Sequence, residues 1–577
     1  MSLLAVACTA CGGSGGSPGG EDASVGSEAG GGRDGATAVG DGSPGSDGGH
    51  GSDGGPGADA GGTEGGLPPG ADAGSDGSGG GAPSTSVLTY HNDAARTGQY
   101  VVETTLTPSN VASSTFGKKF ALSVDGYVYA QPLFVPGLSI GGQTHDAVFV
   151  VTESNSVYAF DATTAGPALW HTNVGTALSC SDLDDCGDLV PGAGITGTPV
   201  IDPATQTMVL VALTKDAAGF HHFLHALDVT SGAERAGSPV EVAPTAQGTG
   251  ANSQNGTIAF DPGTHYQRCA LLLAGGVVYV GIGSNAESDS DNHGWILGFE
   301  ESDLTPTMTF CASPNDNWSS VWQSGGGLSS DSSGFVYAET ANGTFDVDTG
   351  GSDYGDSALK LDATGKVVDY FTPYNQADLS AGDIDFGSAN PVVLPDQSGA
   401  VAHELLASGK PGVLYLLDRD QMGHFQNGSD SQIVQSVSAF PNTSGVTNGI
   451  FMSPVYWNGS VYVGGIGDTV QAFSLSAGKL STSPTSKTTK SFNFPGATVS
   501  ISSSGSSAGI AWVLDGAKGV LYAYDATNLG TELYDTGQAA GGRDKLGASV
   551  KFAVPTVAGG HVYVGTQTEL DVLGLLP

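Results

Sequence analysis

The sequence predicts an all-β fold, an eight-bladed β-propeller of four-stranded blades. From about residue 86 onward, apolar runs rich in Val, Thr and Tyr are short and are separated by Gly, Asn, Asp and Pro. No long segment shows a helical period, which favours strands joined by turns. One motif then recurs eight times at intervals of roughly 50 to 70 residues, the length of a four-stranded blade.

The recurring motif is an apolar strand that ends in Asp and is followed by Thr-Gly or its equivalent. Asx hydrogen bonding starts such a turn, and Gly supplies the positive φ. Each copy follows another apolar strand, so each repeat supplies two neighbouring strands of a blade. The copies are VYAFDATTAG (157–166), LHALDVTSG (224–232), WILGFEESDL (295–304), ALKLDATGK (358–366), VLYLLDRDQMG (413–423), VQAFSLSAGK (470–479), VLYAYDATNLG (520–530) and LDVLGLL (570–576).

A strand far from the last repeat is expected to complete the ring. The eighth copy is followed by no fourth strand before Pro577, whereas KKFALSV at 118–124 precedes the first inner strand and has no blade of its own. We therefore expect 118–124 to form the outer strand of the last blade, because this pairing removes the free edges of the ring. Trp170, after the first copy, is of the type that packs between neighbouring sheets.

The N-terminal part has a different composition from the rest. MSLLAVACTACGG resembles the end of a bacterial lipoprotein signal, with Cys8 as the lipidated residue; the alternative is a chance apolar start. We divide the chain into a signal remnant (1–11), a Gly/Ser/Asp-rich linker expected to be disordered (12–85) and the propeller (86–577), since the linker cannot bury enough apolar area to fold.

The chain is strongly acidic, with 58 Asp and Glu, 18 Lys and Arg, and a formal net charge of -40. This charge argues against nucleic acid as a partner, because phosphates need a basic face. The sequence contains no run of about 18 apolar residues, so we expect no transmembrane helix. We expect an extracytoplasmic monomer that contacts a membrane only through a lipid anchor, at the outer membrane, in the periplasm or on the cell surface, or otherwise a secreted protein.

Four cysteines lie in the propeller region, and an even number in an exported domain suggests disulfides. Cys180 and Cys186 bracket a short acidic loop and are expected to pair, which leaves Cys269 and Cys311 as the second pair. A four-cysteine zinc site is the alternative, but no Cys-x-x-Cys spacing supports it.

The repeat resembles the quinoprotein alcohol dehydrogenase-like (PQQ-repeat) propeller superfamily. That superfamily includes the pyrroloquinoline quinone (PQQ) dehydrogenases and cofactor-free relatives such as the lipoprotein of the outer-membrane barrel-assembly machine. The segment YHNDAARTGQ at 90–99 looks like the entry segment of an uncharacterised group of bacterial exported propellers. The resemblance implies that His91, Asp93 and Arg96 lock this segment onto the ring through a buried ion pair and hydrogen bonds.

Residues 320–420 resemble the true quinoproteins most closely. Asn342 matches a calcium-ligating Asn, Asp353 or Asp356 lies nearest to the position of the catalytic base, and Lys410 matches the basic residue that contacts the quinone oxygens. DIDFGSANPVVLPD at 383–396 also matches. The resemblance implies that, in an oxidoreductase, Asp353 and Lys410 would be catalytic and Asn342 and Lys410 would bind the cofactor.

Several parts of the quinone site are missing from the sequence. The stacking Trp has no counterpart after Gly327, the adjacent-cysteine pair is absent, TKDAAGFHHF (214–223) lacks the acidic metal ligand, and no Cys-x-x-Cys-His haem motif exists. In the quinoproteins the stacking Trp and the adjacent-cysteine pair cover the two faces of the planar quinone. Without them a quinone loses most of its apolar contact. We therefore expect no PQQ and no bound cofactor, with Ca²⁺ as the one exception.

The Ca²⁺ prediction rests on the acidic loop at 343–356. Asp346, Asp348 and Asp353 alternate there with glycines, and hard cations take several carboxylate oxygens; an ordinary solvated loop is the alternative. His221, His222 and His293, on equivalent loops of neighbouring blades, are candidate ligands of a transition metal. Their alternative is hydrogen bonding within polar loops.

These observations lead to three functional hypotheses. The first is an exported, lipid-anchored, non-catalytic propeller that binds an envelope protein or a glycan with its loop face. The second is a PQQ- and Ca²⁺-dependent alcohol or sugar dehydrogenase that uses Asn342, Asp353 and Lys410. The third is a carbohydrate-active lyase or hydrolase, which needs a base and a group that neutralises the sugar carboxylate; Lys410 is the best-placed cation.

Overall fold

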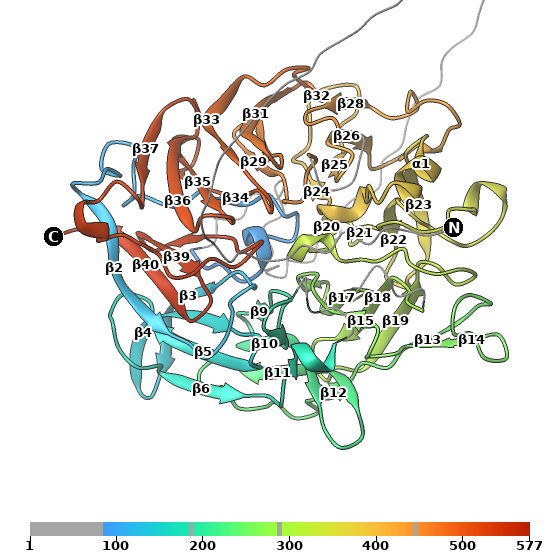
Figure 1. Ribbon diagram of the computed structural model, residues 1–577, viewed down its shortest axis with the longest axis horizontal. Helices are drawn as coiled ribbons and strands as arrows, with labels where there is room; N and C mark the ends of the chain where they lie inside the picture. Colours follow the sequence, from blue (N-terminus) through green and yellow to red (C-terminus); the bar gives the residue numbers. More distant parts are fainter. Residues whose placement is uncertain (1–84, 184–185, 187–188, 285–290, 443–447) are drawn as a thin grey trace, which may run out of the picture. The chain divides into compact units, whose positions relative to one another are not determined.

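The computed structural model describes residues 85–577 apart from 184–185, 187–188, 285–290 and 443–447 (Figure 1). The described residues all belong to one unit, Asp72–Pro577. The signal remnant, nearly all of the linker and Cys8 lie outside the described residues. Within the described part, no helix has the length and hydropathy needed to cross a bilayer.

Eight sheets of at least four strands follow one another around a ring, as the repeat count predicted (Figure 1). From the innermost strand outward, blades 1 to 4 are β3 (Leu133–Ile140), β4 (Gln143–Val151), β5 (Ser156–Asp161) and β6 (Trp170–Asn173); β9 (Val200–Asp202), β10 (Thr207–Lys215), β11 (Phe220–Asp228) and β12 (Val240–Glu241); β16 (Leu272–Ala274), β17 (Val277–Ser284), β18 (Trp295–Glu300) and β19 (Pro306–Cys311); β20 (Ser329–Ser330), β21 (Val336–Glu339), β22 (Ala358–Leu361) and β23 (Val367–Thr372).

The second half of the ring repeats this order. Blades 5 to 8 are β24 (Val392–Val393), β25 (Glu404–Ser408), β26 (Val413–Asp418) and β28 (Gln435–Ser438); β29 (Val455–Trp457), β30 (Ser460–Gly464), β31 (Asp468–Ser476) and β33 (Ser486–Phe492); β34 (Ala497–Ser504), β35 (Ser507–Asp515), β36 (Val520–Asp525) and β37 (Glu532–Asp535); β38 (Thr556–Ala558), β39 (His561–Gly565), β40 (Glu569–Leu575) and β2 (Phe116–Ser123).

Short elements extend these sheets or lie between them. Four short strands add to blades 7, 3, 4 and 6, in this order: β1 (Gln99–Tyr100), β15 (His265–Tyr266), β27 (His424–Phe425) and β32 (Lys479–Leu480). Two further pairs of strands form hairpins: β7 (Leu178–Ser179) with β8 (Gly192–Ala193), and β13 (Thr245–Gln247) with β14 (Thr257–Ala259). The helical elements are α1 (Gln376–Ala381) and the 3-10 turns η1 (Tyr90–Asn92), η2 (Cys180–Asp182), η3 (Gln323–Gly325), η4 (Val347–Thr349), η5 (Phe386–Ser388) and η6 (Ala540–Gly542).

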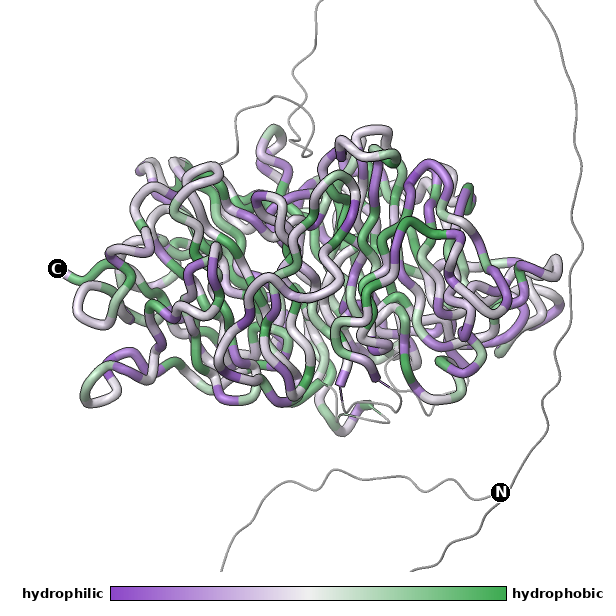
Figure 2. The backbone as a smooth tube through the Cα atoms, turned by 90° about the horizontal axis from the view of Figure 1, so that it is seen from above, coloured by the Kyte–Doolittle hydropathy of each residue, from purple (hydrophilic) through white to green (hydrophobic). Residues whose placement is uncertain are grey.

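The burial pattern of the strands follows from this stacking of sheets. In the middle strands β10 and β35 nearly every residue is buried, because both faces of a blade pack against neighbouring blades. The outer strand β6 instead alternates partly buried and exposed residues. In Figure 2 hydrophobic and hydrophilic residues are interspersed along the tube.

The turn chemistry predicted for the repeat is confirmed. Oδ1 of Asp161, Asp228, Asp362 and Asp525 each accepts the backbone N–H two residues later, at 2.8–3.0 Å. The glycines that end two of these turns, Gly232 and Gly365, have φ of 70° and 83°. The indole of Trp170 donates to the Val229 carbonyl of the next blade at 2.9 Å, so this residue packs between sheets as expected.

The closing strand is also confirmed. β2 pairs antiparallel with β40, from Phe116 opposite Leu575 to Ser123 opposite Glu569, and Figure 1 shows the two strands side by side. The strand begins at residue 116 rather than 118. Phe116 is fully buried against Trp512 and Tyr534 of blade 7, with ring centroids 5.4 and 5.0 Å away.

A segment before this strand contacts all eight blades; we call residues 87–103 the central segment. The blue η1 turn at the middle of Figure 1 belongs to it. Seven of its contacts reach the innermost strand of a blade or the residue next to it, and the eighth reaches the β38–β39 turn. The pairs are Val87–Phe134, Leu88–Ile201, Arg96–Leu271, Ala94–Ser330, Ala95–Val393, Thr97–Tyr456, Gly98–Ile501 and Glu103–Gly560.

Arg96 lies at the centre of these contacts with no exposed surface. Its guanidinium donates to the carbonyl oxygens of Leu271, Leu328 and Tyr90, each at 2.8 Å. The Asp93 carboxylate instead accepts the Thr97 N–H at 2.9 Å. Arg96 therefore fixes the central segment to the ring, as expected. The expected ion pair is replaced by hydrogen bonds to carbonyl oxygens, because no carboxylate in the described part of the chain lies at ion-pair distance from Arg96.

Candidate functional site

The loops that join the second strand to the third, and each outer strand to the next blade, lie at the same end of a meandering four-stranded sheet. Lys410 follows β25 on one of these loops, and its side chain is almost fully buried. Its Nζ lies 2.6 Å from Oδ2 of Asp385 and 2.7 Å from Oδ1 of Asp383. Both aspartates precede η5, on the loop between blades 4 and 5. A cation from blade 5 is thus bound by two carboxylates from the neighbouring connection.

Asn342, which follows β21 of blade 4, binds the same two aspartates. Its backbone N–H donates to Oδ1 of Asp385 at 3.0 Å, and its Nδ2 donates to Oδ1 of Asp383 at 3.1 Å. Its Oδ1 is buried without a hydrogen-bond partner in the described structure. Asn342 and Lys410 therefore share the same two carboxylate partners, Asp383 and Asp385.

Aromatic rings lie beside this ammonium group. The Trp322 and Phe451 ring centroids lie 5.9 and 5.7 Å from Nζ of Lys410, within cation–π range. Phe451 also contacts Phe494 and Phe552, at 5.9 and 6.3 Å between centroids. We call Asn342, Asp383, Asp385, Lys410, Trp322 and Phe451 the Lys410 cluster.

The two aspartates proposed from the sequence as the base lie beside this cluster rather than in it. Asp353 is buried and its Oδ1 accepts the Asn315 N–H at 2.8 Å; burial raises its pKa to about 6. Asp356 is fully buried and accepts the Phe386 N–H at 3.0 Å; burial holds its pKa well above the ordinary value, and the nearby Asp385 carboxylate raises it further. Asp385, which contacts Lys410 directly, was not singled out, although the matching segment 383–396 contains it.

The three aspartates of the predicted Ca²⁺ site do not converge on one point. Oδ1 of Asp346 accepts the Asp353 N–H at 2.9 Å, whereas Asp348 lies on the exposed η4 turn. The described residues contain no group of three or more His, Cys, Asp or Glu that could hold a metal ion. Ca²⁺ binding by this loop stays a prediction.

The three candidate histidines also lie in separate environments. His221 is bonded to Glu241 at 2.7 Å and to Asp216 at 3.2 Å, and these carboxylates raise its pKa. His222 is fully buried, and burial lowers its pKa to about 3. His221 and His222 are consecutive on β11, so they face opposite sides of the sheet. His293 contacts the carbonyls of Ser313 and Ala251 at 2.9 and 3.0 Å.

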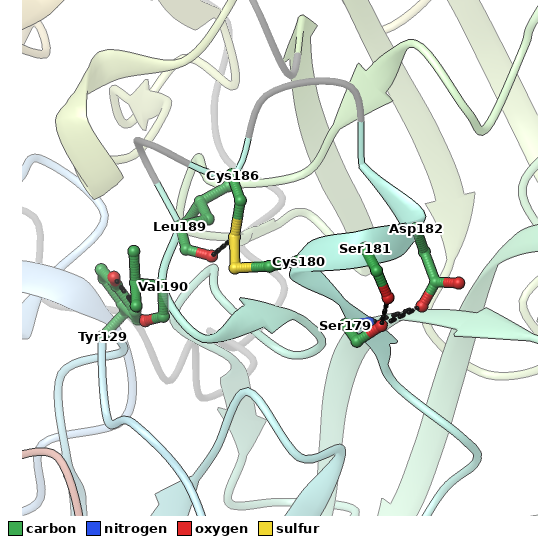
Figure 3. The surroundings of a disulfide bond; sticks show 8 residues. All are labelled: Tyr129, Ser179, Cys180, Ser181, Asp182, Cys186, Leu189 and Val190. Carbon is green, nitrogen blue, oxygen red and sulfur yellow. Dashed lines mark hydrogen bonds between the residues drawn. A yellow bond between two sulfur atoms is a disulfide. The ribbon is translucent and has the colours of Figure 1, made fainter. Parts of the chain in front are cut away.

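One of the two expected disulfides is present. Cys180 and Cys186 are bonded, and Leu189 lies beside Cys186 (Figure 3). Cys269 and Cys311 are free and buried, so the second pairing is wrong. Cys269 precedes the innermost strand of blade 3 and Cys311 ends its outermost strand. Three strand spacings of about 4.8 Å separate such strands, more than a disulfide can span.

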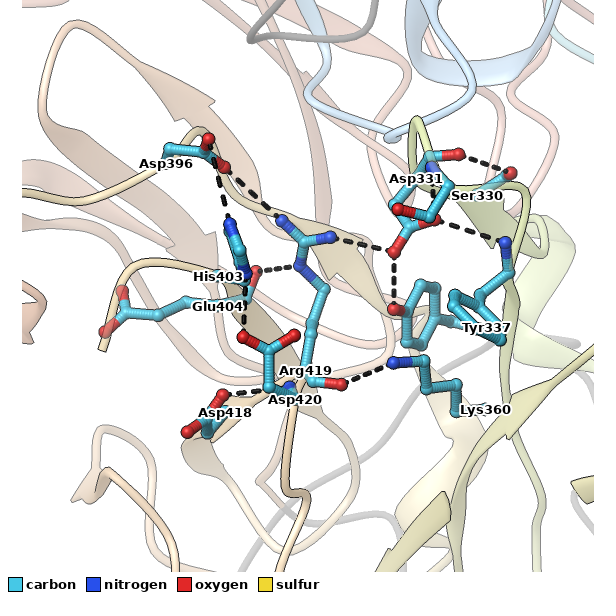
Figure 4. A network of polar contacts seen from close by, with 12 residues as sticks. Ser330, Asp331, Tyr337, Lys360, Asp396, His403, Glu404, Asp418, Arg419 and Asp420 are labelled. Carbon is cyan, nitrogen blue, oxygen red and sulfur yellow. Dashed lines mark hydrogen bonds and ion pairs between the residues drawn. The ribbon is translucent and has the colours of Figure 1, made fainter. Parts of the chain in front are cut away.

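A polar network that the sequence did not reveal ties blade 4 to blade 5 (Figure 4). Nη1 of Arg419 lies 2.9 Å from Oδ2 of Asp331, which also accepts the Tyr337 hydroxyl at 2.7 Å. Nζ of Lys360 donates to the Arg419 carbonyl at 2.6 Å. Asp331, Tyr337, Lys360 and Arg419 are bonded to one another across the two blades, so we assign this network to holding the blades together.

Comparison with known proteins shows a likeness in structure. No protein-family model matches the chain, and neither does any curated protein sequence. The quinohemoprotein alcohol dehydrogenase ADHIIG from Pseudomonas putida HK5 aligns with a TM-score of 0.56 at 12% identity, over 85% of this chain and 80% of that one. The quinohemoprotein alcohol dehydrogenase from Comamonas testosteroni gives 0.55 at 15%, over 85% and 81%.

A europium-containing methanol dehydrogenase aligns equally well, with a TM-score of 0.55 at 13% identity over 85% of this chain and 98% of that one. At such identities the likeness establishes the fold and leaves the activity open. The chain is an eight-bladed β-propeller whose fold is similar to that of these alcohol and methanol dehydrogenases.

Proposed function

We propose that this chain is an exported, lipid-anchored propeller that binds an envelope protein or a glycan with its loop face and catalyses no reaction. The observation that carries this proposal is the packing around Arg96. A Cβ on Gly327 would lie 2.7 Å from Nη2 of Arg96. The resemblance places the quinone's stacking Trp just after Gly327, where this chain has the buried aliphatic side chain of Leu328, while Arg96 fills the space beside Gly327. A quinone would lose that wall.

The Lys410 cluster supports the same conclusion. A hard cation takes six to eight oxygen ligands, and the Lys410 ammonium already binds both aspartates that would supply carboxylates. The residues present therefore do not fit a quinone–calcium pair.

The end of the ring that carries these loops also has an exposed aromatic residue. Phe494, on the loop between blades 6 and 7, is 46% exposed and packs edge-on against Phe451 of the Lys410 cluster. Exposed aromatic rings supported by other rings are typical of the central residues of protein interfaces.

The proposed location rests on two features. The Cys180–Cys186 disulfide is typical of oxidising compartments outside the cytoplasm, and Cys8 is the residue that lipidation would modify. Metabolic labelling with a palmitate analogue tests this: the wild-type chain should be labelled and fractionate with membranes, and Cys8→Ser should abolish both. Cys11→Ser is the matched control, which should behave as wild type.

The absence of catalysis is tested by adding PQQ and Ca²⁺ to the full chain. We expect no saturable heat in calorimetry, no quinone absorbance retained after desalting, and no dye-linked oxidation of alcohols or sugars. Stoichiometric retention of PQQ would overturn the proposal.

An oxidoreductase is the second candidate, favoured by the convergence of Asn342, Asp385 and Lys410 on one loop face. Under this alternative, Lys410→Met or Asp385→Asn should abolish both PQQ retention and dye reduction. For a carbohydrate-active lyase or hydrolase, release of unsaturated or reducing ends from acidic polysaccharides is the corresponding assay.

A further inference from the structure

We propose that the ammonium group of Lys410 is a built-in cation: it holds the position between Asp383, Asp385 and Asn342 that a divalent metal ion would take, and so excludes such an ion from the Lys410 cluster. This inference does not depend on the proposed binding function. It concerns which cation the cluster contains.

The surroundings of the ammonium group resemble the oxygen shell of a metal ion. Nζ of Lys410 lies 2.6 Å from Asp385 Oδ2, 2.7 Å from Asp383 Oδ1 and 3.4 Å from the Asp383 carbonyl oxygen. These oxygens come from one short loop in which Asp383 has a φ of 52°, a conformation that non-glycine residues rarely adopt. The strained turn directs a carboxylate and a carbonyl of the same residue toward one point.

Asn342 adds a further oxygen beside the same two aspartates. Its N–H groups are used by Asp383 and Asp385, but its buried Oδ1 has no hydrogen-bond donor in the described structure. An ammonium group has only three N–H donors to distribute, whereas a metal ion accepts further oxygens around its whole surface. The amide oxygen of Asn342 is thus a ligand that the ammonium does not use and that a metal ion in the cluster could bind.

Charge explains why the two occupants exclude each other. Removing the ammonium would leave the buried Asp385 carboxylate without its cation, which is strongly destabilising. A divalent or trivalent ion could restore the balance, but it cannot bind while a fixed positive charge lies within hydrogen-bond distance of the same oxygens. Lys410→Met removes the charge and keeps an unbranched chain to pack against Trp322 and Phe451.

The test uses Tb³⁺ alone as the probe, because indole excitation sensitises its emission. Trp322 lies next to the cluster, and none of residues 1–84 is Trp. Lys410→Met in the full chain should gain one saturable site, seen as Trp-sensitised emission at least ten-fold above that of the wild type. Lys410→Arg, which keeps the charge, should gain none. Lys410→Met/Asp385→Asn should lose the gained site.

A second measurement assigns the gained site to this cluster. Lys410→Met/Trp322→Phe should lose most of the added emission but keep the added Tb³⁺ equivalent in calorimetry. Ca²⁺ should raise the melting temperature of Lys410→Met more than that of the wild type. If Lys410→Met is unfolded without metal, refolding on addition of Ca²⁺ followed by circular dichroism replaces the emission assay, and failure to refold counts against the proposal.

Two results would overturn the inference. One is Tb³⁺ emission from the wild-type chain that Trp322→Phe and Asp385→Asn both remove, because a metal ion would then share the cluster with Lys410. The other is a folded Lys410→Met variant whose Tb³⁺ binding equals that of the wild type, because the ammonium would then have excluded nothing.

Discussion

The guanidinium of Arg96 packs directly on the backbone of Gly327, so that a Cβ at position 327 would lie within 2.7–2.9 Å of three guanidinium atoms. This contact joins the central segment to the connection between blades 3 and 4. It also explains why position 327 carries no side chain, since Arg96 is buried and bound to carbonyls on both sides.

The contact can be measured by a double-mutant cycle. Gly327→Ala should destabilise the fold by about 1–3 kcal/mol, as overpacking does. In an Arg96→Ala background this cost should largely disappear, so the double variant should be less destabilised than the sum of the singles by about 1 kcal/mol or more. Urea unfolding provides the free energies. Gly166→Ala is the control, because nothing lies within 4 Å of a Cβ there; additive effects would contradict the contact.

The closing strand should carry a large share of the stability of the ring. Phe116→Ala removes a fully buried ring between Trp512 and Tyr534 and should cost about 3–5 kcal/mol. Phe494→Ala, the same substitution at a 46% exposed position, should cost less than about 1 kcal/mol. Equal losses in denaturant midpoint would show that β2 does not close the ring as described.

Burial of Asp353 predicts a specific pH dependence. Its pKa is about 6 in the folded chain and 3.8 ordinarily, so the folded state binds the proton more tightly. Stability contributed by this group is therefore complete below about pH 4 and is lost as the pH rises to about 6, by at most about 3 kcal/mol. Asp353→Asn should remove this loss, seen as a gain over the wild type at pH 7 that vanishes at pH 4.

The same comparison tests the Ca²⁺ prediction. If the 343–356 loop binds Ca²⁺, millimolar Ca²⁺ favours the ionised carboxylate and should stabilise the wild type at pH 7 but not Asp353→Asn. A pH dependence that is the same in both proteins would mean that another group is responsible.

The cysteines should differ sharply in reactivity. Burial raises the pKa of the Cys269 and Cys311 thiols to about 12, so iodoacetamide at pH 8 should leave both unmodified in the folded chain. Both should be alkylated after unfolding without reductant, whereas Cys180 and Cys186 should need reduction first. Peptide mapping by mass spectrometry distinguishes them. Rapid labelling of Cys269 in the native protein would contradict its burial.

The sequence alone determined the ring and its closure. Strands and turns are determined by local sequence, through short apolar runs separated by turn residues and through an Asp that bonds the N–H two residues later, as at Asp161 and Asp525. Eight repetitions of one local pattern fix the blade count, and a strand without a blade at 118–124 is left to pair with the last repeat.

Tertiary structure decided which loop residues meet. Asp353, Asp356 and Asp385 all belong to the segment 320–420 that resembles the quinoproteins. Only Asp385 and Asp383 bind the ammonium group of Lys410, because the connection into η5 carries them across to blade 5. The pairing of Cys269 with Cys311 failed for the same reason: their separation is set by the width of a blade. Contacts between loops depend on how the sheets stack around the ring. No local sequence pattern determines the distance between residues on different loops.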